Sequence, residues 1–151
     1  MLIRLATKSD ESVVLELLEQ LLEEARRTEG KEYKREIRPE RGLVFNEVIS
    51  RKDTFVFVAE EEGRVLGLAT LYLLPIIRHG WQQGHVEDFV IDSTVRGKGI
   101  GTQIFDAVKD FCRKREVRVI KLTSGLGLTG AHRFYERHGG KYTEKMYRFD
   151  L

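Results

Sequence analysis

A glycine-rich turn between a strand-like and a helix-like segment constrains this 151-residue chain more than any other feature. Residues 95–101 read V-R-G-K-G-I-G, after the strand-like residues 85–91 and ahead of a helix expected to open near Gly99. Glycine lacks the Cβ atom that keeps other groups away from the backbone. The first turn of a helix has unpaired N–H groups and the positive end of the helix dipole. Arg96 and Lys98 add positive charge, so the turn suits an anion with several oxygens, such as a phosphate or pyrophosphate.

The same stretch is also compatible with a plain strand-to-helix turn that carries two solvated basic residues. Two well-known phosphate-binding patterns are excluded. A P-loop requires Ser or Thr after its lysine, whereas Lys98 is followed by Gly99. A dinucleotide-binding G-x-G-x-x-G pattern requires a third glycine where Thr102 or Ile104 stands. The pattern that remains is R-x-x-G-x-G at residues 96–101.

The composition predicts one globular domain over residues 1–151, since 41% of the residues are hydrophobic and 33% are charged. A net charge of +2 does not point to a nucleic acid or a membrane surface as partner. No apolar run has the length of a membrane span, and residues 1–10 lack the apolar stretch of a signal peptide, so we expect a cytoplasmic protein. The single cysteine, Cys112, falls on a helical apolar stripe and is expected to be a buried small hydrophobe. No Cys/His cluster predicts a metal site.

Hydrophobic periodicity predicts alternating helices and strands. Strands are predicted at residues 2–5, 54–60, 65–74, 85–91 and 117–123, and helices from a Thr7-x-x-Asp10 cap to about 27, and at about 41–51, 99–115 and 129–138. The polar segment 28–40 is expected to be a mobile connection. Pro75 is expected to end its strand and to open a loop over residues 76–84, in which Trp81 could line a binding site, act as a lid or contact another subunit. Residues 141–151 alternate and predict a final strand or hairpin.

Two adjacent acids, Glu87 and Asp88, interrupt the apolar strand that precedes the glycine turn. Neighbouring residues on a strand point to opposite faces of the sheet. At least one of these acids should therefore face the interior or a cleft, unless a β-bulge intervenes.

A second motif makes the chain resemble a known family. Residues 131–139 read A-H-R-F-Y-E-R-H-G and match the A-x-x-F-Y-E-x-x-G segment of the Gcn5-related N-acetyltransferase (GNAT) superfamily. R-x-x-G-x-G at residues 96–101 resembles the coenzyme A signature of the same superfamily. One helix and one strand separate the two motifs, as that superfamily requires, and the order of elements agrees along essentially the whole chain. The resemblance implies an α/β, GNAT-like fold: a mixed, mostly antiparallel twisted sheet of six to seven strands flanked by about four helices.

The resemblance also implies acetyl-CoA as the acetyl donor, held in a splay between the strands at 85–91 and 117–123. Its pantetheine arm would pair with the strand backbone, and its pyrophosphate would lie on the N–H groups of the glycine turn. The implied cofactor-binding residues are Phe89, Val90, Ile91, Arg96, Gly97, Lys98, Gly99, Ile100, Gly101 and Thr102. One departure concerns the end of the second strand, where many relatives carry an asparagine and this chain has Thr123 and Ser124.

Direct attack of an amine on the thioester requires a base. A lysine-like amine has a pKa of about 10.4, so its neutralisation at pH 7 costs roughly 4–5 kcal/mol. Glu87 is the first candidate, with Asp88 second and water as an intermediary, because this strand should run beside the thioester. The alternative for either acid is a simple ion pair with a nearby Arg or Lys. Tyr135 is the candidate acid, since the tyrosine of F-Y-E commonly protonates the departing thiolate in the superfamily; the alternative is core packing beside Phe134.

The sequence thus predicts an acetyl-CoA-dependent N-acetyltransferase that acts on a primary amine of a small molecule, peptide or protein. The rival is a non-catalytic acyl-CoA-binding sensor or interaction module, which the presence of Tyr135 and Glu87 disfavours. Residues 85–101 also resemble glucosamine-phosphate acetyltransferases, but no motif identifies the acceptor. A homodimer is expected from superfamily habit and from apolar residues in the loop that holds Ile76, Ile77 and Trp81.

Overall fold

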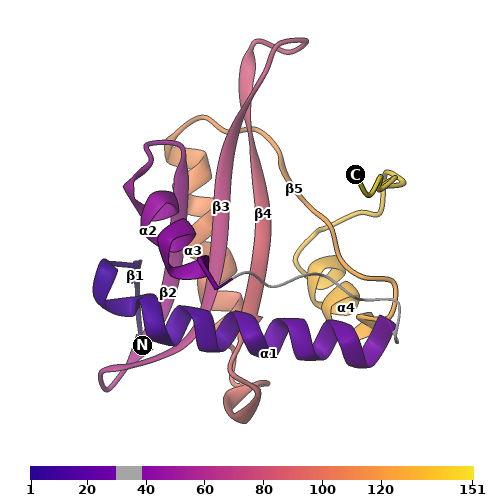
Figure 1. Cartoon of the computed structure of the whole chain (residues 1–151). Helices are drawn as coiled ribbons and strands as arrows, with labels where there is room; N and C mark the ends of the chain where they lie inside the picture. The colour runs from indigo at the N-terminus through magenta and orange to yellow at the C-terminus, as the bar shows by residue number, and fades with distance from the viewer. Residues whose placement is uncertain (30–38) are drawn as a thin grey trace.

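Five strands form one sheet in the order β1-β2-β3-β4-β5 within residues 1–29 and 39–151, the parts of the chain that the computed structural model describes (Figure 1). The strands are β1 (Leu2–Leu5), β2 (Thr54–Glu61), β3 (Arg64–Ile76), β4 (Trp81–Ile91) and β5 (Ile120–Leu122). The first four pair antiparallel with their sequence neighbours, whereas β5 pairs parallel to β4. The sheet is therefore mixed and mostly antiparallel, as predicted.

Four α-helices flank this sheet, again as predicted (Figure 1). They are α1 (Glu11–Glu29), α2 (Arg41–Ser50), α3 (Ile100–Lys114) and α4 (Thr129–Arg137). Helices α1 and α2 lie on one face of the sheet and α3 lies on the other, while α4 lies beyond β5. None of the helices in the described ranges is long and apolar enough to cross a membrane.

Strand alternation places a hydrophobic core on each face of the sheet. The core under α1 and α2 contains Val14, Leu17, Phe45, Val56, Val58, Leu68 and Val90. The core under α3 is the larger one, and its fully buried side chains include Leu71, Ile104, Val108 and Cys112. Cys112 is buried, as predicted, and this burial raises the pKa of its thiol to about 11.

The cap before α1 forms as predicted. The backbone N–H of Thr7 donates to Asp10 Oδ2 at 2.7 Å, and the Asp10 backbone N–H donates back to the Thr7 carbonyl at 3.0 Å. The Arg4 guanidinium donates to the same carboxylate at 2.8 Å, which lowers the pKa of Asp10 to about 2. The helix continues two residues past the predicted end. Most of the connection predicted at 28–40 lies outside the described residues.

The hairpin formed by β3 and β4 is longer than predicted and extends past the rest of the sheet (Figure 1). Pro75 does not end β3 but pairs with Gln82, and the predicted loop at 76–84 shrinks to the turn at residues 77–80. The reason is the local sheet topology. Strand β2 accompanies β3 only as far as Tyr72, so Pro75 lies where one side of β3 is free and a missing N–H is tolerated.

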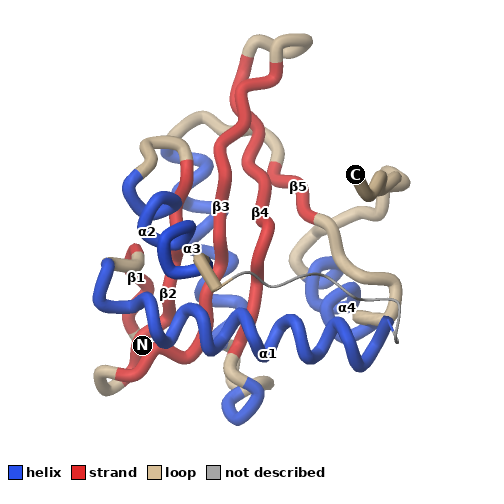
Figure 2. Tube along the Cα trace, viewed as in Figure 1, coloured by secondary structure: helices blue, strands red, loops and turns tan. Residues whose placement is uncertain are grey.

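The predicted final strand or hairpin at residues 141–151 is wrong. This segment, which we call the C-terminal tail, contains no strand or helix (Figure 2). Strand β5 is also shorter than the predicted 117–123. The described chain therefore has five strands rather than six to seven. Alternation yields a strand only where a neighbouring strand supplies hydrogen-bond partners, and the tail pairs with no strand among residues 1–29 and 39–151.

Candidate active site

The site begins where β4 and β5 diverge. Parallel pairing runs from Gly84 opposite Ile120 to Val86 opposite Leu122, and then stops. Strand β4 continues for residues 87–91 with β3 as its only partner strand in the described chain. Backbone groups of this stretch that point away from β3 therefore line an open edge, where an extended, amide-containing ligand can pair as an added strand does.

The glycine turn follows directly at the end of this open edge. Asp92 Oδ1 accepts hydrogen bonds from the backbone N–H and the hydroxyl of Thr94, at 2.9 and 2.7 Å, and so shapes the short helical turn Ser93–Val95. Gly97 and Gly99 then adopt φ values of +82° and +80°, in the left-handed region that L-residues rarely adopt. Gly99 is the N-cap of α3. The unpaired N–H groups of the first helical turn are thus presented beside the open edge of β4.

A cleft of about 730 Å³ connects the open edge, the glycine turn and α4. All the predicted site residues except Lys98 line it, namely Glu87, Phe89, Val90, Ile91, Arg96, Gly97, Gly99, Ile100, Gly101, Thr102 and Tyr135. Thr123 and Ser124, the residues that stand where many GNAT relatives carry an asparagine, line it as well. The Ser124 hydroxyl is buried without a hydrogen-bond partner in the described chain, as expected of a group that meets a ligand.

Sequence reasoning missed the part of the cleft that α1 contributes. Leu21, Glu24, Arg27 and Thr28 line it, yet in the sequence they belong to an ordinary amphipathic helix. Glu24 accepts hydrogen bonds from Arg27 at 2.5 Å and from Arg96 at 3.4 Å. Burial opposes ionisation of this carboxyl, but the two guanidinium groups outweigh it and lower the pKa of Glu24. With Arg137, three arginines line the cleft and favour an anionic ligand.

A β-bulge contains the two acids of β4. Ala69 pairs with Phe89 and Leu71 pairs with Val86, so Thr70 alone lies opposite both Glu87 and Asp88. The sequence analysis allowed for a bulge as an exception to strict alternation, and the structure contains one at this position. At this bulge the two carboxyl groups line two different cavities, Glu87 the large cleft and Asp88 a second one.

Glu87 lines the large cleft and remains largely exposed, with His85 Nε2 at 3.0 Å from its Oε2 atom. Asp88 lies against the other face of the sheet. Burial raises the pKa of Asp88, the charge of Glu87 acts in the same direction, and a hydrogen bond from Thr70 opposes both. A raised pKa makes the Asp88 carboxylate a better proton acceptor than an unshifted aspartate.

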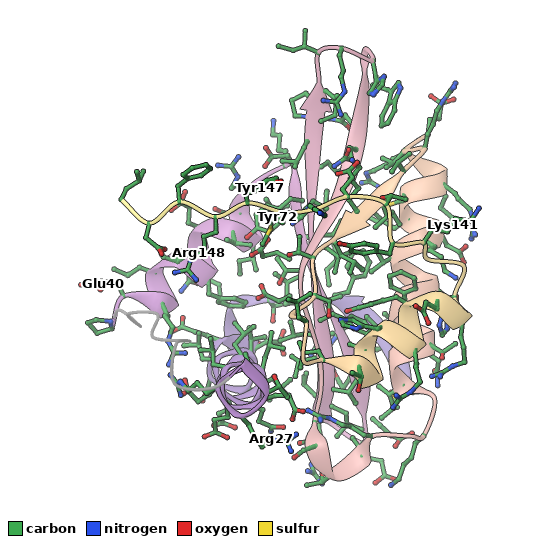
Figure 3. All side chains as sticks on the ribbon, turned by 90° about the vertical axis from the view of Figure 1, so that its right-hand side faces the viewer. Arg27, Glu40, Tyr72, Lys141, Tyr147 and Arg148 are labelled. Atoms are coloured by element: carbon green, nitrogen blue, oxygen red, sulfur yellow. The ribbon has the colours of Figure 1, made fainter. Side chains whose placement is uncertain are left out.

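Asp88 lines a second cavity of about 410 Å³ beneath α1 and α2. Its walls are mainly apolar, formed by Val14, Leu15, Leu18, Val44, Phe45, Val48 and Val56. Its polar groups are Glu40, Arg41, Thr70, Tyr72 and Asp88 (Glu40 and Tyr72 are labelled in Figure 3). Burial raises the pKa of Tyr72, as do the charges of Asp88 and Glu87. The two cavities approach each other at the bulge, because adjacent residues of β4 line them.

Tyr135 lies in a cluster of aromatic rings at the wall of the cleft. Its ring centroid is 5.5 Å from that of Phe134 and 6.2 Å from those of Phe89 and Phe105. Burial raises the pKa of its hydroxyl to about 12, so this group is protonated at neutral pH. The chain turns sharply behind it, where the Gly140 N–H donates to the Tyr135 carbonyl at 2.8 Å.

Trp81 lines neither cavity. It lies at the end of the β3–β4 hairpin, where its ring stacks on His79 with centroids 4.8 Å apart. Ile77, at the turn, is fully exposed.

Comparisons with known proteins show the family to which the chain belongs. The family model described as the acetyltransferase (GNAT) family matches residues 15–140, and the chain therefore belongs to this family of acyltransferases. It is 34% identical over 100 residues to glucosamine 6-phosphate N-acetyltransferase of Trypanosoma brucei brucei, covering 65% of each chain. It is 27% identical over 92 residues to aminoalkylphosphonate N-acetyltransferase of Salmonella typhimurium, covering 61% of this chain and 58% of that one. Both matches span less than two thirds of the relative's own length.

The fold also matches a solved structure over its full length. A tetramutant protein of Bacillus halodurans superimposes with a TM-score of 0.85 at 25% identity, with 100% of each chain covered. The predicted family and the GNAT-like fold are thus confirmed.

Proposed function

We propose that this protein is an acetyl-CoA-dependent N-acetyltransferase that transfers an acetyl group to a primary amine by direct attack. The observation that carries the proposal is the continuous cleft from the open edge of β4 to the glycine turn. The backbone of Phe89, Val90 and Ile91 would pair with the amide groups of the donor's pantetheine arm. The N–H groups of the first turn of α3, with Arg96 and Arg27, would hold its phosphates.

The roles of the reacting groups follow from their positions. Glu87, at the bulge and exposed to the cleft, would take the proton from the attacking amine, directly or through water. Tyr135, partly buried and protonated in the wall of the same cleft, would donate a proton to the departing thiolate. One N–H group in the Phe89–Val90 region would stabilise the oxyanion of the tetrahedral intermediate.

The second cavity suits the acceptor. Its apolar walls would receive the body of an amine, and Asp88 would attract the ammonium group before it loses its proton. Because mainly apolar side chains form its described walls, we infer an amine with an apolar body, such as an alkyl- or arylalkylamine.

The test combines turnover and binding. Release of thiol from acetyl-CoA should be measured with a panel of alkyl- and arylalkylamines, amino sugars and their phosphates, polyamines, amino acids and peptides. We expect turnover, with the apolar amines preferred. Tight acetyl-CoA binding by calorimetry without turnover on any amine would favour the rival, a non-catalytic sensor.

Tyr135→Phe tests the acid role with the best amine from that panel. Acid–base groups contribute roughly 10²–10⁴ in rate. A thiol of pKa about 8.5 is already a fair leaving group, so we expect a loss near 10²-fold with acetyl-CoA affinity almost unchanged. Tyr142→Phe, at an exposed tyrosine outside the cleft, is the matched control. Unchanged turnover in Tyr135→Phe would remove this hydroxyl from the mechanism.

A further inference from the structure

Two carboxyl groups line the large cleft in the described part of the chain, and the proposed mechanism uses only one of them. Glu87 lies at the bulge, where the amine would lose its proton. Glu24 lies at the other end, where it accepts a hydrogen bond from Arg96 of the glycine turn. A carboxylate is unexpected beside a site for phosphates, because like charges repel each other. The position of Glu24 therefore needs a physical explanation.

Contacts of α1 on both sides of the cleft keep Glu24 in this position. Gln20, one helical turn earlier, accepts a hydrogen bond from the backbone N–H of Ser93 at 3.0 Å through its Oε1 atom. One turn later, a Cβ atom on Gly127 would lie only 2.7 Å from the Thr28 carbonyl oxygen, so α1 closely contacts the loop after β5. Helix α1 is thus held at the end of β4 and at the loop after β5, with Glu24 between the two contacts.

Each oxygen of the Glu24 carboxylate is bonded to one arginine. Oε1 accepts a hydrogen bond from Arg27 at 2.5 Å, and Oε2 accepts one from Arg96 at 3.4 Å (Arg27 is labelled in Figure 3). The Glu24 side chain is 25% exposed, whereas the side chains of Arg27 and Arg96 are 72% and 45% exposed. The carboxylate is therefore enclosed by its surroundings, while both guanidinium groups can turn towards a ligand without movement of the backbone.

The same two arginines are the side chains that the proposed function assigns to the donor's phosphates. A guanidinium group binds a carboxylate and a phosphate with the same paired N–H donors. A phosphate that binds Arg27 and Arg96 must therefore displace Glu24 from them, and it then lies close to the displaced negative charge. Both effects reduce the affinity of the cleft for a ligand that carries phosphates.

We propose that Glu24 lowers the affinity of the cleft for the donor and for the product alike, and thereby promotes release of the product. The inference rests on the proposed function. Coenzyme A retains all the phosphates of acetyl-CoA, so contacts to phosphates bind substrate and product equally and do not accelerate the chemical step. Product release limits turnover in many enzymes. A carboxylate that competes for Arg27 and Arg96 shortens the time that the product occupies the cleft.

The test removes the charge of Glu24 and, as a matched control, the charge of its neighbour. In Glu24→Gln the side-chain carbonyl can still accept a hydrogen bond, but the negative charge is lost. Glu23→Gln removes the same charge from the same turn of α1, at an exposed position that does not line the cleft. Glutamate and glutamine have similar helix propensities, so melting curves should show that both variants fold like the wild type.

Calorimetry with acetyl-CoA and with coenzyme A provides the first readout, because it requires no knowledge of the amine. We expect Glu24→Gln to bind both ligands roughly fivefold more tightly than the wild type, the effect of losing one partly exposed competing charge. Glu23→Gln should stay within about twofold of the wild type, since solvent and salt screen an exposed charge outside the cleft. The gain in Glu24→Gln should shrink as the salt concentration rises.

The dissociation rate of coenzyme A, measured by displacement in a stopped-flow instrument, provides the second readout. This rate should fall several-fold in Glu24→Gln, because affinity differences between related complexes lie mostly in dissociation. An unchanged dissociation rate, an equal gain in Glu23→Gln, or unchanged affinity in Glu24→Gln would overturn the inference. Weaker binding in Glu24→Gln would overturn it too, and would show that Glu24 orients the two arginines for the phosphates. Failure of the wild type to bind either ligand would overturn the proposed function and this inference with it.

Discussion

The two halves of β4 show how one strand can serve two purposes. Residues 81–86 pair with β3, and at Gly84–Val86 they also pair with β5, so this half is locked into the sheet. Among the described strands, residues 87–91 pair with β3 alone, and their other edge faces the cleft. The bulge at Glu87 and Asp88 lies at the change from one half to the other. The open edge at the site therefore arises because β5 diverges from β4 after Val86, and not because a loop is inserted there.

The largest effect is expected at the junction of the two halves. Glu87→Gln should reduce turnover by roughly 10²–10⁴-fold, since the amide cannot accept the proton of the amine. Asp88→Asn should reduce turnover less and mainly raise the KM for the amine, because we assign Asp88 to the acceptor cavity. Steady-state kinetics on both variants with the same amine distinguishes the two carboxyl groups. The reverse pattern, with turnover lost in Asp88→Asn only, would transfer the role of base to Asp88.

A smaller effect, on stability alone, is expected behind the paired half. Leu71 pairs with Val86, is completely buried and lines neither cavity. Leu71→Ala should lower the free energy of unfolding by about 3 kcal/mol, the usual cost of the lost contacts and the cavity left behind. Urea unfolding measures this, with Leu74→Ala at an exposed position of the same strand as the control, expected within about 0.5 kcal/mol of wild type. A change in acetyl-CoA affinity in folded Leu71→Ala would contradict the assignment of stability to the paired half of β4 and of donor binding to the open half.

The smallest effect is expected on acetyl-CoA affinity at Gly101, where the open half of β4 lies against α3. A Cβ atom on Gly101 would lie 3.5 Å from Phe134 and 3.6 Å from Ile91 and Phe89, which is ordinary contact distance. Gly101→Ala should therefore fold normally, yet its methyl group would lie in the cleft and weaken acetyl-CoA binding by up to about tenfold, or 1.4 kcal/mol. Calorimetry on a variant with an unchanged melting curve measures this. Wild-type affinity would place the donor farther from α3 than we propose.

Local chemistry explains which parts of the site were predictable. The glycine turn could be read from the sequence because Gly97 and Gly99 have conformations that only glycine adopts readily, and Arg96 follows from the motif. The sequence allowed the bulge only as an exception to strict alternation. The residues around Glu87 and Asp88 do not determine which residue of β3 lies opposite them. The contributions of Glu24 and Arg27 were not predictable, because helix periodicity does not say which end of α1 will lie beside β4.

The sequence by itself determined the elements that depend on short-range interactions: the strands and helices of the core, the cap at Thr7, the buried Cys112 and the turn that begins α3. Only the tertiary structure decided how long strands run and which edges stay free. Pro75 is tolerated because β2 ends early, and the cleft opens because β5 diverges from β4. The tail is no strand because it pairs with no sheet edge in the described part of the chain. The physical reason is the same in each case. A strand forms only when its backbone N–H and C=O groups bond to a neighbouring strand that is distant in sequence. The residues of the strand itself determine only its β-propensity and which side chains face the core.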